Sequence, residues 1–361
     1  MQQTQDTSAI RRWLWSGAAL ILAMVVIGGI TRLTGSGLSM VEWNVISGTL
    51  PPLSEAAWAQ AFAQYQQFPE FQKLNFTMTL SGFKQIFWWE YTHRLLGRLM
   101  GVVFLLPFLY FLLKGYLNGW LFKRLLFILL LGASQGLMGW LMVKSGLVDN
   151  PHVSHFRLAA HLCLALSLIG TILWTIADLR PKRAAPLSPS PGLKRASGLV
   201  LGAVLGQIVL GAFVAGLKAG FYQNTYPLMN GEFFPSYLKG FLTWRNFLEN
   251  GSFIQFLHRW VAIVVLLLVV RFWYQSRTTG VSSVIRQNAT FLLLTVLVQV
   301  GLGIATLVLH VPLWLGVLHQ VVAVGLFSLA VWLLHQLSTT AKPASKSSYA
   351  EHSAARVLHS V

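Results

Sequence analysis

The chain has 361 residues, of which 55% are hydrophobic and only 10% are charged, and its mean hydropathy is +0.61. A soluble protein carries about 25% charged residues, so this chain lacks the charge needed to cover a water-facing surface, and soluble enzymes are excluded. Its single cysteine, Cys163, excludes an internal disulfide, a cysteine-based zinc site and an iron–sulfur cluster. The composition indicates a membrane protein with several spans.

Eight stretches are apolar and long enough to cross a bilayer, which takes about 20 residues. Arg11 and Arg12 precede the first stretch, but its apolar run is too long for a signal peptide and no A-x-A-like site follows it. We therefore expect an all-α integral membrane protein with eight transmembrane helices. The expected spans are Trp13–Thr31, Leu95–Leu113, Leu125–Val143, Phe156–Ala177, Gly198–Leu217, Phe253–Phe272, Ala289–Leu309 and Leu313–His335.

The net charge of +17 is unevenly distributed over the segments between these spans. An even number of spans places both termini on one side, and the segments on that side hold 16 of the 27 basic residues and three of the ten acidic ones. The positive-inside rule then predicts cytoplasmic termini. The short N-terminal segment has no transit peptide, which favours a bacterial inner membrane. The basic excess is thus attributed to topology and not to nucleic acid binding.

The chain divides into two halves. A linker rich in Pro, Ser and basic residues separates them, and a polar tail follows the second. Two long outer segments, 35–89 and 218–252, contrast with short inner ones. The predicted units are the first half (1–179), the linker (180–197), the second half (198–337) and a disordered cytoplasmic tail (338–361).

The odd-numbered spans share a glutamine–glycine motif. Q-G-L-M-G begins at Gln135, Q-I-V-L-G at Gln207 and Q-V-G-L-G at Gln299, and the first span has M-V-V-I-G from Met24. Small residues let helices pack closely in lipid, which is the simplest interpretation of the glycines. Glutamines are costly in lipid, so we expect them to face the interior of the bundle.

The even-numbered spans each carry a histidine near the outer end: His93, His161, His258 and His319. This recurrence predicts two parallel four-helix repeats related by a pseudo-two-fold axis along the membrane normal. Intramembrane histidines are usually functional. Two imidazoles on facing helices commonly hold haem iron, so we expect one metal site per half, with all four histidines as ligands.

Zinc is the alternative to haem iron at these histidines, and Glu90 is a possible further zinc ligand in the first half. Glu90 lies one turn before His93, but the second half has Gln255 at the equivalent place. Zinc would need further ligands in each half, so two haem sites fit better. The asymmetry also suggests one reactive site, where Glu90 shuttles protons, and one site that only carries electrons or holds structure. A plain ion pair to Arg94 is the alternative role for Glu90.

Haem propionates need cationic partners, and arginine matches carboxylates with a planar fork. The candidates are Arg94, Arg98, Arg157 and Arg259, which lie next to or about one turn from the histidines. Alternatively, these arginines are interfacial anchors at helix ends.

The remaining histidines are weaker candidates. His152 and His155 fall in an outer segment or at its edge, and His310 ends the seventh span. His335 lies at the inner end and is expected to be structural, and Cys163 is expected to be a packing residue.

Several motifs around these residues point to a known family. They are G-G-I-T-R-L-T-G-S-G-L-S (28–39), V-E-W (41–43), G-T-L-P-P-L-S (48–54), F-W-W-E-Y-T-H-R-L-L-G-R (87–98), N-T-Y-P-L-M-N-G (224–231), W-R-N-F-L-E-N (244–250) and Q-F-L-H-R-W (255–260). Through them nearly the whole chain resembles the haem A synthase family of proteobacteria and mitochondria.

The resemblance implies an oxidoreductase that converts the C8 methyl of haem O to a formyl group by successive hydroxylations, giving haem A for terminal oxidases. It implies that Glu90, His93 and His161 form the substrate haem O site, and that His258 and His319 hold haem b as a cofactor. Some relatives carry cysteine pairs in the outer loops, which this chain lacks.

Three other functions stay open on the residues alone: a di-haem b electron-transfer cytochrome, a transporter and a non-catalytic haem-handling assembly factor. The sequence also leaves open whether the chain associates with a haem O synthase, an electron donor or a second copy of itself.

Overall fold

The computed structural model describes residues 7–42, 47–146, 153–180, 191–240, 243, 246–278 and 281–339. Within these ranges all regular structure is helical, and eight helices are long and apolar enough to span a membrane. The prediction of an all-α membrane protein with eight spans is therefore confirmed. The eight helices are α1 (Ser8–Leu33), α4 (Leu80–Leu113), α5 (Gly119–Gly146), α6 (His155–Asp178), α7 (Pro191–Gly216), α8 (Gly251–Gln275), α9 (Ser283–Val308) and α10 (Leu313–Thr339).

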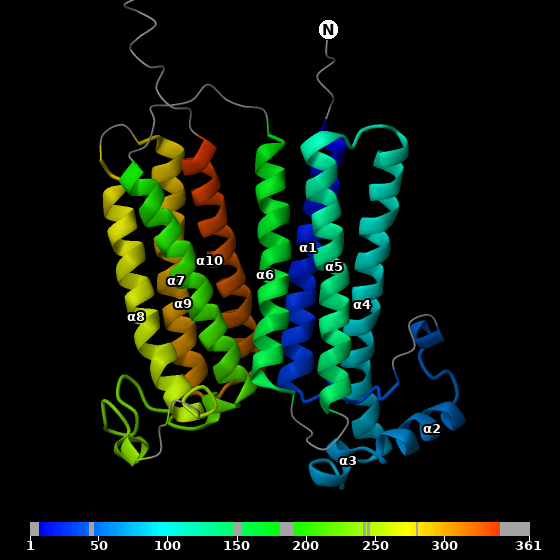
Figure 1. Cartoon of the computed structure of the whole chain (residues 1–361). Helices are drawn as coiled ribbons and strands as arrows, with labels where there is room; N and C mark the ends of the chain where they lie inside the picture. Colours follow the sequence, from blue (N-terminus) through cyan, green and yellow to red (C-terminus); the bar gives the residue numbers. More distant parts are fainter. Residues whose placement is uncertain are drawn as a thin grey trace, which may run out of the picture.

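The helices form two groups of four that stand side by side (Figure 1). Each odd-numbered span packs against the next one in the chain, giving the hairpins α1–α4, α5–α6, α7–α8 and α9–α10. The groups meet where α6 contacts α7 and α10, and where α1 contacts α10. One apolar core runs through all eight helices. The pseudo-two-fold symmetry of the halves stays a prediction.

Two helix boundaries differ markedly from the expected spans. α4 begins at Leu80 and not near Leu95, because its first turns carry polar residues that hydropathy rejects, while Thr79 caps the end by accepting a hydrogen bond from the Gly82 amide at 3.4 Å. α7 begins at Pro191 and not near Gly198, since proline suits the first turn of a helix.

The expected linker (180–197) thus overlaps the start of α7, and residues 181–190 lie outside the described part of the chain. The expected tail also falls outside it, apart from the last residues of α10 at 338–339.

One end of the bundle, the loop side, carries two short helices, α2 (Glu55–Tyr65) and α3 (Pro69–Lys73) (Figure 1). Three 3₁₀ turns lie in the long connections between spans. The connection from α1 to α4 holds η1 (Ser47–Thr49), and the connection from α7 to α8 holds η2 (Ala219–Phe221) and η3 (Ser236–Gly240). The N-terminal end of α1 and the ends of α6 and α7 that are joined by the linker lie on the opposite side.

An aromatic cap covers the extended start of α4 on the loop side. Ser54 begins α2 as its N-cap and accepts a hydrogen bond from the Ala57 amide at 3.1 Å. The cap is the cluster of Trp58, Tyr65, Phe83, Ile86, Phe87 and Tyr91. It joins the first outer segment to α4 and so places that segment over the first half.

On the opposite side, His335 of α10 makes the structural contact expected of it. Its Nε2 lies 2.7 Å from Asp178 Oδ1 on α6, and Asp178 Oδ2 accepts from Arg124 at 3.4 Å. The Trp174 ring packs edge-on against the same imidazole. This cluster links the two halves.

Candidate functional site

Each of the four predicted histidine ligands rests against a glycine of the preceding long helix. A β-carbon at Gly28, Gly211 or Gly303 would come closer to the imidazole than β-carbons usually do, whereas at Gly139 it would make an ordinary van der Waals contact. The distances from the ideal β-carbon are 3.2 Å for Gly28 to His93 Nε2, 3.7 Å for Gly139 to His161 Cε1, 3.1 Å for Gly211 to His258 Cε1 and 2.9 Å for Gly303 to His319 Cε1. These glycines therefore leave space for the imidazole rings as well as letting the helices pack closely, and we call such a glycine the socket of its histidine.

The motif glutamine, one turn before the glycine, contacts the same histidine because residues i and i+4 share a helix face. We call each glutamine–glycine pair with its histidine a cradle. The contacts are Gln135 Nε2 to His161 Nε2 at 3.1 Å, Gln207 Nε2 to His258 Nδ1 at 3.1 Å and to its carbonyl at 2.8 Å, and Gln299 Nε2 to His319 Nε2 at 3.4 Å and to its carbonyl at 3.0 Å. The glutamine–glycine motif thus positions the imidazole ring of the next long helix.

The cradle of His93 differs, because Met24 stands where the others have glutamine. The Met24 methyl group packs close to Gly97 of α4. Among the described residues no hydrogen bond to the His93 side chain is present. His93 is therefore held by shape alone, while the other three imidazoles are also held by an amide.

The second-half pair has the geometry of a two-histidine metal site. The ring centroids of His258 and His319 are 6.4 Å apart and the rings are inclined at 76°. A metal–imidazole bond is about 2 Å long, so this spacing leaves room for one metal ion between two ring nitrogens. In the described part of the chain, buried His319 Nδ1 has no hydrogen-bond partner. These residues fit a haem iron.

The first-half pair comes from α4 and α6. His93 and His161 lie close enough to interact electrostatically, and His161 Nδ1 is likewise buried without a partner among the described residues. The described residues contain no cluster of three or more His, Cys, Asp or Glu side chains that could hold a metal ion. Each half thus offers a pair of imidazoles among the described residues.

Glu90 is almost fully buried, with 2% of its surface exposed. Its carboxylate accepts hydrogen bonds from Ser39 Oγ at 2.7 Å, from the Met40 amide at 2.7 Å and from Arg94 at 2.5 Å. Arg94 in turn donates to the carbonyls of Met40 at 2.6 Å and Glu42 at 2.8 Å. The pair holds the segment after α1 against α4, one turn from His93.

The second half repeats this arrangement with an amide in place of the carboxylate. Arg259 donates to Gln255 Oε1 at 3.1 Å, to the Thr225 carbonyl at 2.7 Å and to the Gln223 carbonyl. Gln255 donates to the Ala219 carbonyl at 2.8 Å. In each half the arginine after the histidine therefore fastens the loop-side backbone.

The four predicted propionate partners fall into two kinds. Arg94 and Arg259 are buried and bonded to protein carbonyls, as described above. Arg98 lines a cavity of about 290 Å³ beside α2, together with Glu42 and Phe87. Arg157 donates to the Leu141 carbonyl at 3.2 Å. The prediction that these groups meet propionates stays a prediction.

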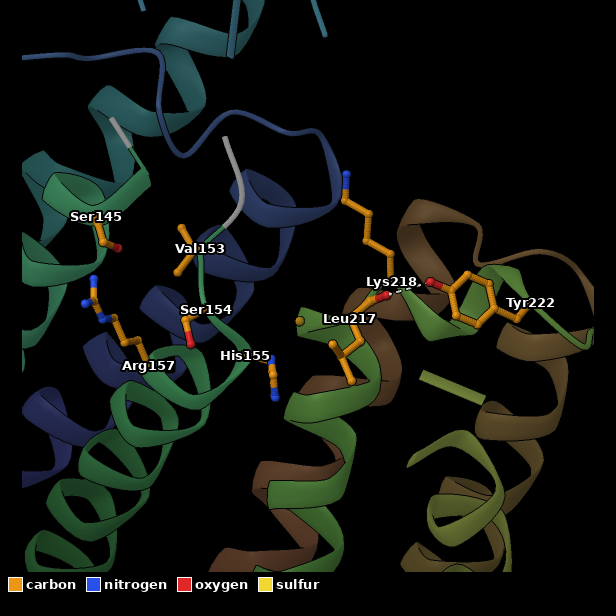
Figure 2. Close-up of a pocket in the computed structure, with 9 residues that line it drawn as sticks. Ser145, Val153, Ser154, His155, Arg157, Leu217, Lys218 and Tyr222 are labelled. Carbon is orange, nitrogen blue, oxygen red and sulfur yellow. Dashed lines mark hydrogen bonds between the residues drawn. The ribbon is translucent and has the colours of Figure 1, made fainter. Parts of the chain in front are cut away.

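Arg157 also borders a larger cavity of about 570 Å³ between the halves on the loop side. In Figure 2 its guanidinium reaches toward Ser145 at the end of α5, and Lys218 and Tyr222 lie on the far side. Neither cavity is lined by the four histidines. The complete lining of the larger one is Ser145, Val153, Ser154, His155, Arg157, Gly216, Leu217, Lys218 and Tyr222.

The weaker candidates lie away from the cradles. The His155 ring packs edge-on against Phe213 at 5.3 Å and lines the larger cavity. His310 follows α9 with φ of 61°. Cys163 is a half-buried free thiol on α6. His152 lies outside the described residues.

Sequence reasoning missed one feature of the site. It did not identify the motif glutamines as partners of the histidines, although the i, i+4 spacing to the glycine contained that signal.

The fold and the site define a class: polytopic α-helical membrane proteins with a partly buried histidine pair in each half, whose chemistry fits haem iron. The sequence profile of the COX15-CtaA family, described as cytochrome oxidase assembly proteins, matches residues 11–331, and the chain belongs to this family.

Its curated relatives include three haem A synthases that match over most of both chains. The one from Nitrosospira multiformis is 47% identical over 93% of this chain and 96% of its own length. The one from Beijerinckia indica is 49% identical over 92% and 94%. The one from Flavobacterium psychrophilum is 43% identical over 92% and 99%.

Proposed function

We propose that this protein is a haem A synthase, an oxidoreductase that converts the C8 methyl of haem O to a formyl group. The observation that carries this proposal is the inequality of two otherwise similar sites. The first half has Met24 and Glu90 where the second has Gln207 and Gln255. Two sites that both only carry electrons would not need this difference. A substrate site and a permanent cofactor site need different residues.

In this account the first half binds the substrate, haem O, between His93 and His161. The second half binds haem b between His258 and His319, and bound haem b would supply one-electron transfer. The amide contacts of Gln207 and Gln299 fix the second pair, as a permanent cofactor requires. His93 lacks such a contact, which suits a site whose occupant must enter and leave.

Glu90 is the proposed catalytic group of the first site. It either accepts a proton from the reacting methyl region or stabilises positive charge that develops there. Its three hydrogen bonds hold the carboxylate in one place, one turn from His93. Two successive hydroxylations would convert the methyl to a gem-diol, which loses water to give the formyl group; this is a four-electron oxidation, and its oxidant comes from outside the chain. Arg94 is a positioning residue, because it acts by holding Glu90.

The aromatic cap and the segment after α1 cover the loop side of the first half and would limit the access of water to the site. The charge distribution supports a bacterial inner membrane with both termini in the cytoplasm. The loop side would then face the periplasm, and the product would serve terminal oxidases.

The test is production of haem A in a membrane that contains haem O but no haem A. The chain is expressed in such a host, and the haems are extracted, separated and identified by mass. We expect haem A, or its hydroxylated precursor, with the wild-type chain, and neither with a His161→Ala variant produced at the same level. Haem O and haem b alone, with wild-type protein present in the membrane, would favour the electron-transfer cytochrome.

A further inference from the structure

α1 differs from the other three cradle helices at two places on one face. The positions one turn before and one turn after the cradle glycine share its face. In α1 they hold a thioether and a guanidinium, whereas the other helices have an amide and an apolar side chain. The four sets are Met24, Gly28 and Arg32; Gln135, Gly139 and Val143; Gln207, Gly211 and Ala215; and Gln299, Gly303 and Leu307.

Arg32 lies in the last turn of α1, at the point where this helix is fixed to both halves. Thr31 Oγ1 donates to the Trp89 carbonyl of α4 at 3.3 Å. The Leu33 side chain lies 2.8 Å from the β-carbon position of Gly316 on α10. Arg32 is one turn beyond Gly28, which contacts His93, and helix side chains lean toward the N-terminus. Its side chain therefore leans from the loop side toward the depth of His93.

Arg32 is half-buried, and among the described residues none accepts a hydrogen bond from its side chain or forms an ion pair with it. Glu90, which follows Trp89 on α4, is already bonded to Arg94. A half-buried cation without a partner is costly unless an anion completes the site. The guanidinium fork is shaped to receive a carboxylate with two hydrogen bonds.

We propose that Arg32 binds a propionate carboxylate of the haem in the first half. This inference rests on the proposed function, because it takes the first half as the substrate site. The second half has Ala215 at the equivalent position, so a carboxylate contact from this position of the cradle helix belongs to the substrate site alone. α1 thus contributes selectivity to a site whose histidines come from α4 and α6.

The test compares two ligands that differ only in the propionates: haem O and its dimethyl ester. The purified full-length protein, as isolated, is titrated with each, and binding is followed by the change in haem absorbance. Wild-type protein should bind the free acid about tenfold or more tightly than the ester, as expected for a charge-assisted hydrogen bond. Arg32→Gln should reduce this preference to near unity, with ester affinity unchanged.

Two variants sharpen the test. Arg12→Gln removes the same charge from the other end of α1 and should keep the wild-type preference. Arg32→Lys keeps the charge without the fork and should keep a smaller preference, which covers the case in which Arg32→Gln does not fold.

The outcomes separate the two proposals. A wild-type protein that binds haem O but ignores esterification, or an Arg32→Gln protein that keeps the full preference, would overturn the role of Arg32 and leave the synthase standing. A wild-type protein that binds no haem O would overturn both.

Discussion

At the scale of single residues, the positions of the histidine rings depend on glycines that leave space beside them. Gly303 leaves so little space beside His319 that a β-carbon would lie 2.9 Å from Cε1. Real β-carbons do not tolerate that approach, so the imidazole must move when the socket is filled. The same glycine would otherwise be a poor choice in a helix, where alanine is favoured by about 0.5–1 kcal/mol.

We therefore expect Gly303→Ala to displace His319 and weaken haem binding in the second half by about 1–3 kcal/mol, the usual cost of overpacking. The haem content and the low-spin absorbance of the purified protein measure this. Gly301→Ala is the matched control on the same helix, because its β-carbon meets nothing within 4 Å. Equal haem loss in both variants would show that the socket is not the cause.

Glu90→Gln tests whether the carboxylate acts in chemistry or only in structure. Gln255 already performs the structural task in the second half, since it bonds Arg259 and a loop carbonyl. We expect Glu90→Gln to fold and bind haem O but to make haem A about a hundredfold more slowly or worse. The measurement is haem A formed per protein. Full haem A production by this variant would show that Glu90 only holds the segment after α1 in place.

Contacts between individual side chains could be predicted from the sequence only where the two residues are close in the chain. Glu90, His93 and Arg94 share one helix turn, and their association follows from spacing alone. The other partners of this group, Ser39 and Met40, come from the segment after α1. Helix periodicity gives no information about such distant contacts, so they could not be predicted.

At the scale of elements, hydropathy located all eight spans but not the ends of the helices. A helix extends beyond the apolar core wherever capping and packing support it, as α4 does under the aromatic cap. The short helices α2 and α3 also went unpredicted. Their signals, an N-cap serine and aromatic residues at helical spacing, were present at Ser54, Trp58 and Tyr65.

A carboxyl group that titrates near neutrality, that of Glu70, accepts a hydrogen bond from Tyr65 of the aromatic cap. The pKa of Glu70 is raised to about 7, mainly by burial and to a smaller extent by the carboxylate of Glu90, while the hydrogen bond from Tyr65 and the charge of Lys218 oppose the shift. The folded cap therefore binds a proton more tightly than the unfolded chain, whose value is near 4.5. The stability of the cap should fall as pH rises from about 4.5 to 7 and then level off.

Hydrogen exchange of residues 55–73, measured across this pH range, tests this expectation. Wild-type protection should decrease toward pH 7 after correction for the intrinsic exchange rate. Glu70→Gln mimics the protonated acid and should remove the pH dependence while keeping the bond from Tyr65. A variant with the same pH profile as the wild type would show that another group controls the cap.

At the scale of the whole molecule, two groups of four helices are held together by α1, α6, α7 and α10. The sequence predicted the division into halves from the repeated histidines and the linker composition. It did not predict how the halves meet, because interfaces of small and apolar residues look alike in a lipid-embedded chain. The pair of His335 and Asp178 is one polar contact across this boundary.

Removing this pair should loosen the boundary without touching the cradles. We expect His335→Ala to lower the stability of the protein by about 0.5–1.5 kcal/mol, the usual net contribution of one hydrogen bond, because Asp178 is partly exposed and keeps its contact with Arg124. Thermal unfolding in detergent measures it. Asp178→Asn and the double variant complete a cycle, and additive losses would show that the two side chains do not stabilise each other.

The central claim is that the two histidine pairs hold different haems, and the most direct test is the haem composition of variants that lack one pair at a time. Wild-type, His161→Ala and His319→Ala proteins are purified from membranes that contain haem O, and their haems are extracted and identified by mass. The account predicts that His161→Ala retains haem b and loses haem O and haem A, whereas His319→Ala loses haem b. The same single haem type in all three proteins would contradict it.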